Sequence, residues 1–217
     1  MNTPGFPSNP QVLRERYIRQ LDSSDNPTQT ARELAEDLFS LDLTVYSSDF
    51  SFDSLLYSAM AKSILDESLS LHPEQIQIIN EIAFNDAVIV SAPTSFGKTF
   101  CIFEYIARVT PQNIVLIVPT LALVDEYVKR VIKRYQRFFS QYKIHTHIDE
   151  NRKYDFNQKN IFILTHDRVV HESTYAMIEK IDFLVIDEVY KLETDPHNDR
   201  VLVLNMAYYY LAQRAQK

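Results

Sequence analysis

Short apolar runs alternate with helical stretches along the last two-thirds of the chain, and this alternation constrains the fold more than any other feature of the sequence. Fully apolar strands separated by helices are typical of a parallel sheet that is covered on both faces. The pattern predicts these elements in order: a helix from Pro73, a strand at 86–91, a helix at 98–109, a strand at 113–118, a helix at about 121–139, strands at 143–148, 160–165 and 181–187, and a helix from Arg200 to Gln213. We therefore expect an α/β fold with a mostly parallel sheet covered by helices.

The region before this alternation differs in both pattern and charge. Its apolar spacing predicts three short helices, at 10–22, 29–41 and 54–69. Residues 1–72 contain five Lys and Arg against eleven Asp and Glu, whereas residues 73–217 contain seventeen against eighteen. We therefore predict a small helical N-terminal extension over 1–70 and an α/β domain over 71–217.

Gly97 is one of only two glycines in the 217 residues, where average usage would supply about fifteen. It follows the predicted strand at 86–91 and directly precedes Lys98 and Thr99. A loop that wraps a polyphosphate needs a residue that tolerates positive φ, followed by a helix N-terminus that favours the anion. The spacing therefore indicates a phosphate loop, with Lys98 placed for the phosphates and the Thr99 hydroxyl for a magnesium ion. The general pattern has a further glycine five residues before Gly97, where this chain has Ala92.

The Gly-Lys-Thr tripeptide alone is weak evidence, because a Gly-Lys-Ser/Thr sequence occurs by chance in roughly one chain in ten of this size. A second indication is the apolar run at 181–186, which ends in Asp187 and Glu188. Since the carboxyl ends of parallel strands meet at one edge of a sheet, these carboxylates are expected beside the phosphate loop. There Asp187 would complete the magnesium shell and Glu188 would orient and deprotonate the attacking water.

These residues resemble the motifs of superfamily-two helicases of the DEAD/DEAH-like, DExH type. The stretch from Ala92 to Thr99 is similar to motif I, in which alanine commonly replaces the first glycine, and 71–75 resembles the upstream element whose glutamine reads adenine. The resemblance assigns the following residues to ATP binding: Gln75, Ala92, Pro93, Thr94, Ser95, Phe96, Gly97, Lys98 and Thr99.

Three further stretches occur in the order that this family shows. Residues 118–123 resemble motif Ia, 162–168 resemble motif Ib, and 187–190 resemble motif II. The family usually has Asp or His at the last position of motif II, where this chain has Tyr190. The resemblance covers about residues 71–217.

The resemblance implies a RecA-like P-loop NTPase domain, the ATP-binding half of an ATP-dependent DNA or RNA helicase or translocase. It implies that Lys98, Asp187 and Glu188 are catalytic and that Thr99 and Asp187 hold Mg²⁺ while ATP is hydrolysed. The residues that would grip the nucleic-acid backbone are Thr120, Thr165 and Arg168.

The family also has a motif III and a second RecA-like domain that carries an arginine finger. The chain ends at Lys217, before motif III is expected, so the resemblance implies a second RecA-like domain in the same chain or in a partner chain. These residues alone are expected to bind nucleotide with little hydrolysis and no unwinding.

Two other classes of protein remain as alternatives. One is a nucleotide-binding regulatory or scaffold module without strand-separating activity, against which the intact Lys98, Asp187 and Glu188 argue. The other is a small P-loop kinase or GTPase, which would need base-specificity or acceptor-binding motifs that the sequence does not show. Nothing in the sequence distinguishes DNA from RNA.

Composition limits the partners and the cell compartment. The formal net charge of −7 argues against nucleic-acid binding through one large basic surface. No run approaches the eighteen apolar residues of a membrane span, no targeting segment is evident, and the single Cys101 cannot form a disulfide within the chain. We therefore expect a cytoplasmic protein without a membrane partner.

Three other patterns have both a functional and a structural interpretation. His145 and His147 alternate on a predicted strand but have no spaced Cys or His partners, which favours a structural role over metal binding. The run 208–210 of three tyrosines lies in a predicted helix, where the rings cannot all face one way, so partial burial is expected. A basic stripe on the 121–139 helix, which a solvated face explains more often than phosphate binding, contains Lys129, Arg130, Lys133, Arg134 and Arg137.

Overall fold

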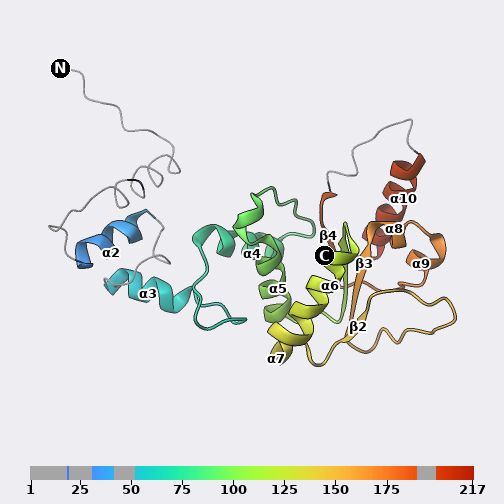
Figure 1. Cartoon of the computed structure of the whole chain (residues 1–217), viewed down its shortest axis with the longest axis horizontal. Coiled ribbons are helices and arrows are strands. Elements are labelled where there is room, and N and C mark those ends of the chain that lie inside the picture. The colour runs from blue at the N-terminus through green and yellow to red at the C-terminus, as the bar shows by residue number, and fades with distance from the viewer. Residues whose placement is uncertain (1–18, 20–30, 42–51, 190–198) are drawn as a thin grey trace, which may run out of the picture. The chain divides into compact units, whose positions relative to one another are not determined.

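The computed structural model describes four parts of the chain: residue 19 and residues 31–41, 52–189 and 199–217. Contacts divide the chain into two compact units: Met1–Asn80 with Ala92–Cys101, and Glu81–Ser91 with Ile102–Lys217. The elements before the sheet are α2 (Ala31–Ser40), α3 (Phe52–Met60), α4 (Pro73–Phe84), the 3₁₀ turn η2 (Thr94–Phe96) and α5 (Lys98–Val109). The four α-helices are labelled in Figure 1, and the chain passes between the units within α4 and α5 and again between 91 and 92.

The second unit contains a four-stranded sheet in which every strand pair is parallel. The strand order is β2-β3-β1-β4, with β1 at Asn113–Val118, β2 at Lys143–His145, β3 at Asn160–Thr165 and β4 at Phe183–Ile186. All residues of the two central strands, β1 and β3, are buried. The apolar runs within them, at 114–118 and 161–164, are explained by a parallel sheet that is covered on both faces. The predicted α/β fold class is confirmed.

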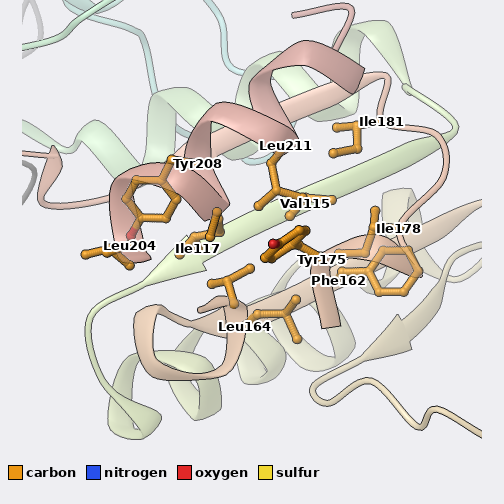
Figure 2. Packing of buried hydrophobic residues seen from close by; sticks show 12 residues of the cluster. Val115, Ile117, Phe162, Leu164, Tyr175, Ile178, Ile181, Leu204, Tyr208 and Leu211 are labelled. Carbon is orange, nitrogen blue, oxygen red and sulfur yellow. The ribbon is translucent and has the colours of Figure 1, made fainter. Parts of the chain in front are cut away.

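One face of the sheet carries a hydrophobic cluster that joins the strands to the last helices. Val115 and Ile117 of β1 face the same way as Phe162 and Leu164 of β3, because they are paired in register and side chains alternate along a strand. Figure 2 shows these side chains under α10 (Asp199–Arg214). The cluster also includes residues from α8 (His166–Val169), α9 (Glu172–Ala176) and α10: Val169, Tyr175, Leu204, Ala207, Tyr208 and Leu211.

The remaining helices of this unit bury a group of aromatic rings. Phe103 of α5 is fully buried, and its ring centroid lies 5.4 Å from that of Tyr127, 5.8 Å from that of Tyr135 and 5.6 Å from that of Phe139. Ring pairs at these separations stabilise a core beyond their area of contact. The group ties α5 to α6 (Leu121–Lys129) and α7 (Gln136–Phe139), which are the helices that follow β1.

The predicted strand at 86–91 is wrong. Residues 87–93 have no regular secondary structure, and the apolar side chains of Val88 and Ile89 are 38% and 86% exposed. A strand is stabilised by a hydrogen-bonded neighbour and by burial, and among the described residues this run has neither in the sheet. The apolar sequence therefore predicted a strand where no ladder forms.

The edge of β4 that faces away from β1 pairs instead with residues 215–217. Gln216 N–H donates to the Ile181 carbonyl at 3.0 Å, and Leu184 N–H donates to the Lys217 carbonyl at 2.7 Å. Among the described residues, the expected strand before the phosphate loop is therefore not found beside the strand that precedes Asp187.

The helix predicted at 121–139 is interrupted. α6 ends at Lys129, a π-helical turn, η3, covers Arg130–Arg134, and α7 follows after Tyr135. Tyr135 N–H donates to the Arg130 carbonyl at 2.8 Å, a five-residue step. This π-helical turn directly precedes Tyr135, whose ring belongs to the buried aromatic group.

Other element predictions were confirmed or corrected at their ends. The helices predicted at 29–41, from Pro73, at 98–109 and at 200–213 are present as α2, α4, α5 and α10. The 54–69 helix ends at Met60, because the chain turns and pairs Lys62 with Ser70, and the 143–148 strand ends at His145. The helix predicted at 10–22 lies outside the described residues apart from residue 19.

Candidate functional site

Gly97 has the backbone conformation that the phosphate-loop prediction requires. Its φ of 86° and ψ of 31° lie in the left-handed region, between η2 and the first residue of α5. A Cβ built on Gly97 would lie 3.1 Å from Gln75 Nε2, so a side chain there would meet both backbone strain and a close neighbour. The loop therefore turns directly into the N-terminus of a twelve-residue helix, which is the arrangement that attracts phosphate.

The side chain of Lys98 lies back across this loop. Its Nζ donates to the carbonyl of Ala92 and, at 3.2 Å, to the carbonyl of Pro93. The ammonium group is thus held at the opening of the loop by the two residues that begin it. Lys98 and Thr99 occupy the first turn of α5, so their backbone N–H groups belong to the positive end of the helix.

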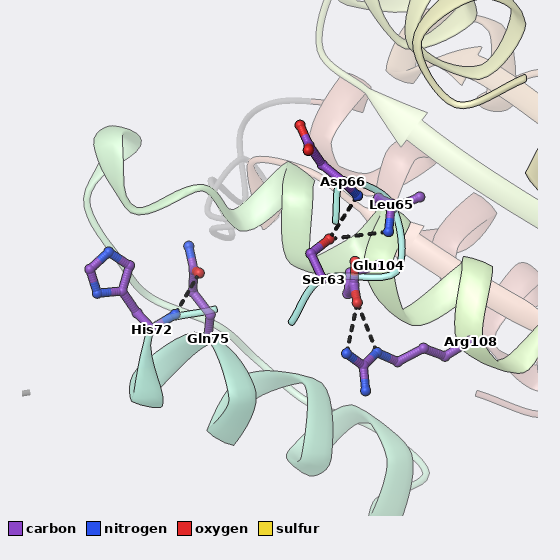
Figure 3. Close-up of polar contacts among 7 residues, drawn as sticks. All are labelled: Ser63, Leu65, Asp66, His72, Gln75, Glu104 and Arg108. Carbon is purple, nitrogen blue, oxygen red and sulfur yellow. Dashed lines mark hydrogen bonds and ion pairs between the residues drawn. The ribbon is translucent and has the colours of Figure 1, made fainter. Parts of the chain in front are cut away.

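Gln75 joins the start of α4 to the loop. Its Oε1 accepts a hydrogen bond from His72 N–H at 3.1 Å, shown in Figure 3, and its Nε2 donates to the Phe96 carbonyl at 2.9 Å. The first contact is half of a capping box. A carboxamide has two N–H donors and two acceptor lone pairs, so these bonds leave capacity for one further donor and one further acceptor.

Asp187 and Glu188 follow β4 at the carboxyl edge of the sheet in the second unit. Asp187 N–H donates to the Ile117 carbonyl at 2.9 Å, which continues the β1–β4 ladder by one residue. The Asp187 Oδ1 accepts from Glu188 N–H at 2.9 Å, and Glu188 has a φ of 55°. This positive φ is uncommon for a residue with a side chain, and such strain is often found at functional sites.

Comparison with protein families covers both the phosphate loop and the carboxylates after β4. The sequence model of the DEAD/DEAH box helicase family matches residues 72–207, which include the phosphate loop and the carboxylates after β4. The chain belongs to the DEAD/DEAH box helicase family.

Anti-bacteriophage protein B of Escherichia coli (strain K12) is similar to the chain. It is 30% identical over 163 residues, which are 71% of this chain and 21% of that protein. The chain therefore spans about a fifth of the length of this relative. No solved structure matches the chain.

Within this helicase domain, the structure brings the sequence-predicted site residues together in two groups. Gln75 and the loop 92–99 lie in one compact unit, and the five predicted residues that follow strands lie in the other. In that second group, β1, β3 and β4 end together, because Val118 pairs with Thr165 and Ile117 pairs with Ile186. The residues gathered at this carboxyl edge are Thr120, Thr165, Arg168, Asp187 and Glu188.

The three residues predicted to grip nucleic acid each have a local structural role. Thr120 is exposed and caps α6, where its hydroxyl accepts from Leu123 N–H at 3.3 Å. Thr165 is 5% exposed and precedes α8, and the Arg168 guanidinium donates to the carbonyl of Thr146. Of the three, Thr120 presents the most accessible side chain.

A buried histidine and tyrosine at this edge were not assigned a role from the sequence. His166 is 6% exposed; its Nε2 lies 3.0 Å from the Asp187 carbonyl oxygen and its Nδ1 lies 2.6 Å from the Tyr208 hydroxyl. Burial, and then the negative charge of Asp167, raise the pKa of Tyr208, so the phenol keeps its proton. The sequence shows only that a histidine directly follows a buried strand. Its two partners could not be identified from the sequence, because they are 21 and 42 residues away.

The other patterns noted in the sequence have structural explanations or remain predictions. His145 is buried and bonded to Asn160, whereas His147 is exposed and lies beyond β2. Tyr208 is buried while Tyr209 and Tyr210 are 61% and 39% exposed, as expected for adjacent residues on a helix. The basic stripe is largely exposed, and its phosphate-binding interpretation stays a prediction.

Some features of the site lie outside what the structure describes. Tyr190, the unusual last residue of motif II, is outside the described residues. Among the residues that are described, no group of three or more His, Cys, Asp or Glu side chains has the arrangement of a metal site. The same residues include no helix that is long and apolar enough to cross a membrane.

Proposed function

We propose that this chain binds ATP with Mg²⁺ and that its carboxylates support ATP hydrolysis by the helicase or translocase to which it contributes. The observation that carries the proposal is the left-handed Gly97 immediately before Lys98 and Thr99 at the start of α5. Few loops combine a positive φ, a lysine and a helix N-terminus in three consecutive residues, and together they suit a polyphosphate.

Each residue of the loop has a separate task in this proposal. The Lys98 ammonium exchanges the carbonyls of Ala92 and Pro93 for oxygens of the β- and γ-phosphates. The remaining donor and acceptor of the Gln75 amide suit an adenine edge, which offers one of each. Because the same amide also bonds the Phe96 carbonyl, adenine recognition and loop geometry are linked through one side chain.

The carboxylates after β4 supply the reacting end of the site. The Thr99 hydroxyl and the Asp187 carboxylate are oxygen ligands of the kind that Mg²⁺ prefers, and the ion neutralises charge on the phosphates when it is bound. Glu188 orients the attacking water and accepts its proton. Its backbone has a positive φ, and its N–H donates to the Asp187 carboxylate, so the two acidic residues are joined by a hydrogen bond.

Thr120, Thr165 and Arg168 are proposed to hold the sugar-phosphate backbone of DNA or RNA without reading its sequence. A second RecA-like domain, in the same chain or in a partner, completes the catalytic site. A cytoplasmic location follows from this activity, since ATP and nucleic acid are both present there.

Nucleotide binding by the 217 residues tests the proposal directly. We expect the wild-type chain to bind a fluorescent ATP analogue and Lys98→Ala to lose at least tenfold in affinity, because the variant lacks the phosphate-binding cation. The matched control is Lys153→Ala, since Lys153 is exposed and lies on the loop between β2 and β3. Equal affinities for wild type and Lys98→Ala would refute the assignment of the loop.

The printed name of the Escherichia coli relative supports a biological role. We extend the proposal to defence against bacteriophage, on the 30% identity to Anti-bacteriophage protein B. Cells that express the protein should show fewer phage plaques than cells that express the Lys98→Ala variant. Equal plaque counts with a panel of phages would speak against this role without bearing on ATP binding.

A further inference from the structure

His166 stands between the motif II carboxylates and the last helix. It is the first residue of α8, and its ring contacts Asp187 on one side and Tyr208 of α10 on the other. His166 and Tyr208 are 6% and 4% exposed. The two hydrogen bonds are therefore shielded from water, so the loss of either one would leave a buried polar group without its partner at a large cost in free energy.

The two partners select one tautomer of the neutral His166 ring. A backbone carbonyl can only accept a hydrogen bond, so the Nε2 that faces the Asp187 carbonyl at 3.0 Å must carry the hydrogen. The Nδ1 is then the acceptor and takes the hydrogen of the Tyr208 hydroxyl at 2.6 Å. The Asp187 carbonyl thus selects this tautomer, and the Tyr208 hydroxyl stabilises it by donating to the Nδ1.

The hydrogen bond from His166 orients the peptide group between Asp187 and Glu188. The carbonyl that His166 holds and the Glu188 N–H belong to the same planar unit. That N–H donates to the Asp187 Oδ1 at 2.9 Å, and the plane enters Glu188 at its φ of 55°. One hydrogen bond therefore sets the direction of both the Asp187 carboxylate and the Glu188 backbone.

We propose that His166 and Tyr208 are positioning residues that align Asp187 and Glu188 for magnesium-bound ATP. The inference rests on the proposed function and adds two residues to the site, neither of which touches the nucleotide. Tyr208 lies in α10, which packs against β1 and β3 in the same hydrophobic cluster, so the alignment of motif II depends on the docking of this helix.

Binding of ATP with and without Mg²⁺ tests the proposal, because only the magnesium-dependent part requires Asp187. The wild-type chain should bind a fluorescent ATP analogue more tightly in Mg²⁺ than in EDTA. In Tyr208→Phe, which keeps the ring in the core and removes only the hydroxyl, this enhancement should fall about threefold to tenfold. The affinity in EDTA should not change, since the loop at 92–99 is intact, and this value also shows that the variant is folded.

Two substitutions of His166 sharpen the test. His166→Ala should lose the enhancement as Tyr208→Phe does, whereas His166→Gln should recover much of it because the glutamine Nε2 can donate to the Asp187 carbonyl. Tyr209→Phe is the matched control, as it removes a hydroxyl from the exposed neighbour in the same helix. If Tyr208→Phe, His166→Gln and His166→Ala all keep the full magnesium enhancement of the wild type, the proposal is overturned.

The tautomer of His166 is a readout that needs no nucleotide. Long-range ¹⁵N–¹H correlation spectra of the histidine-labelled chain should show the Nε2–H form in wild type and a shift toward the Nδ1–H form in Tyr208→Phe. A wild-type Nδ1–H form would contradict the inference and leave the proposed function standing. Absence of ATP binding by the wild type in both Mg²⁺ and EDTA would instead refute the proposed function, and the positioning role would fall with it.

Discussion

The two ends of the parallel sheet differ in how far their amide and carboxylate side chains are buried. At the amino ends of the strands, Asn113 and Asn160 are buried and bonded to each other at 2.9 Å, to Asp182 at 3.1 Å and to His145 at 3.0 Å. At the carboxyl ends, Asp187 and Glu188 are only half-buried. The buried amides of the first end bond to one another and so stabilise the fold, whereas the carboxylates of the second end are partly open to solvent.

The largest effect is expected at the amino end. Asn160→Ala should lower the free energy of unfolding by about 2–4 kcal/mol, because it removes a partner from the buried side chains of His145 and Asn113 and from two backbone carbonyls of the preceding turn. Urea denaturation followed by circular dichroism measures this. Asn157→Ala, an exposed residue on the preceding turn, is the control. A loss below about 0.5 kcal/mol would break the contrast between the two ends.

At the carboxyl end, a substitution should change ligand binding more than stability. Asp187→Asn keeps an acceptor for Glu188 N–H but removes the charge, so stability should change by less than about 1 kcal/mol. The magnesium enhancement of ATP affinity should fall about tenfold, because a neutral amide is a poor ligand for a hard cation. Titration with a fluorescent nucleotide measures the enhancement, and Asp125→Asn on the exposed face of α6 serves as the control. Unchanged enhancement would remove Asp187 from the site.

A smaller effect on stability is expected at the two residues with positive φ, of which only one has a proposed catalytic role. Glu188 and Thr110 are the non-glycine residues with positive φ in the described chain, at 55° and 51°. Glycine at either position should raise stability by about 0.5–1 kcal/mol, as it relieves the left-handed strain. Glu188→Gly should also slow ATP turnover by the complete protein at least about a hundredfold, whereas Thr110→Gly should not. Equal turnover in both variants would show that Glu188 is not the base.

The smallest effect concerns pH at the amino end. Burial is the main cause that lowers the pKa of His145, the hydrogen bond with Asn160 opposes it, and the nearby charges of Arg152 and Lys143 add to the lowering. The unfolded chain therefore takes up a proton near pH 6.5 before the folded chain does, so the stability from neutral His145 is complete above that pH and is lost as pH falls below it. Denaturation curves from pH 7.5 to 5 should show a steeper loss for wild type than for His145→Gln. Parallel curves would contradict this assignment.

Much of the fold could be predicted because its signals are local. The apolar runs at 113–118 and 160–165 are long enough to be strands and too short to span a core as helices, and both became central strands. Gly97 was predicted to have positive φ because its neighbours require a turn into a helix, and it does. The run at 86–91 has an equally apolar sequence but no strand formed, since strand formation depends on a neighbour that the run itself does not contain.

The sequence by itself determined the parallel α/β architecture, the turn at Gly97 and the order of the motifs that place the chain in the DEAD/DEAH box helicase family. Only the tertiary structure decided that His166 joins Asp187 to Tyr208, that 215–217 pair with the edge of β4, and that the helix after β1 contains a π-helical turn. The physical reason is the sequence separation over which each kind of interaction acts. Backbone propensity and apolar spacing act over a few residues, whereas the contacts of His166 and of residues 215–217 join segments that meet only after the sheet has brought its strands and helices together.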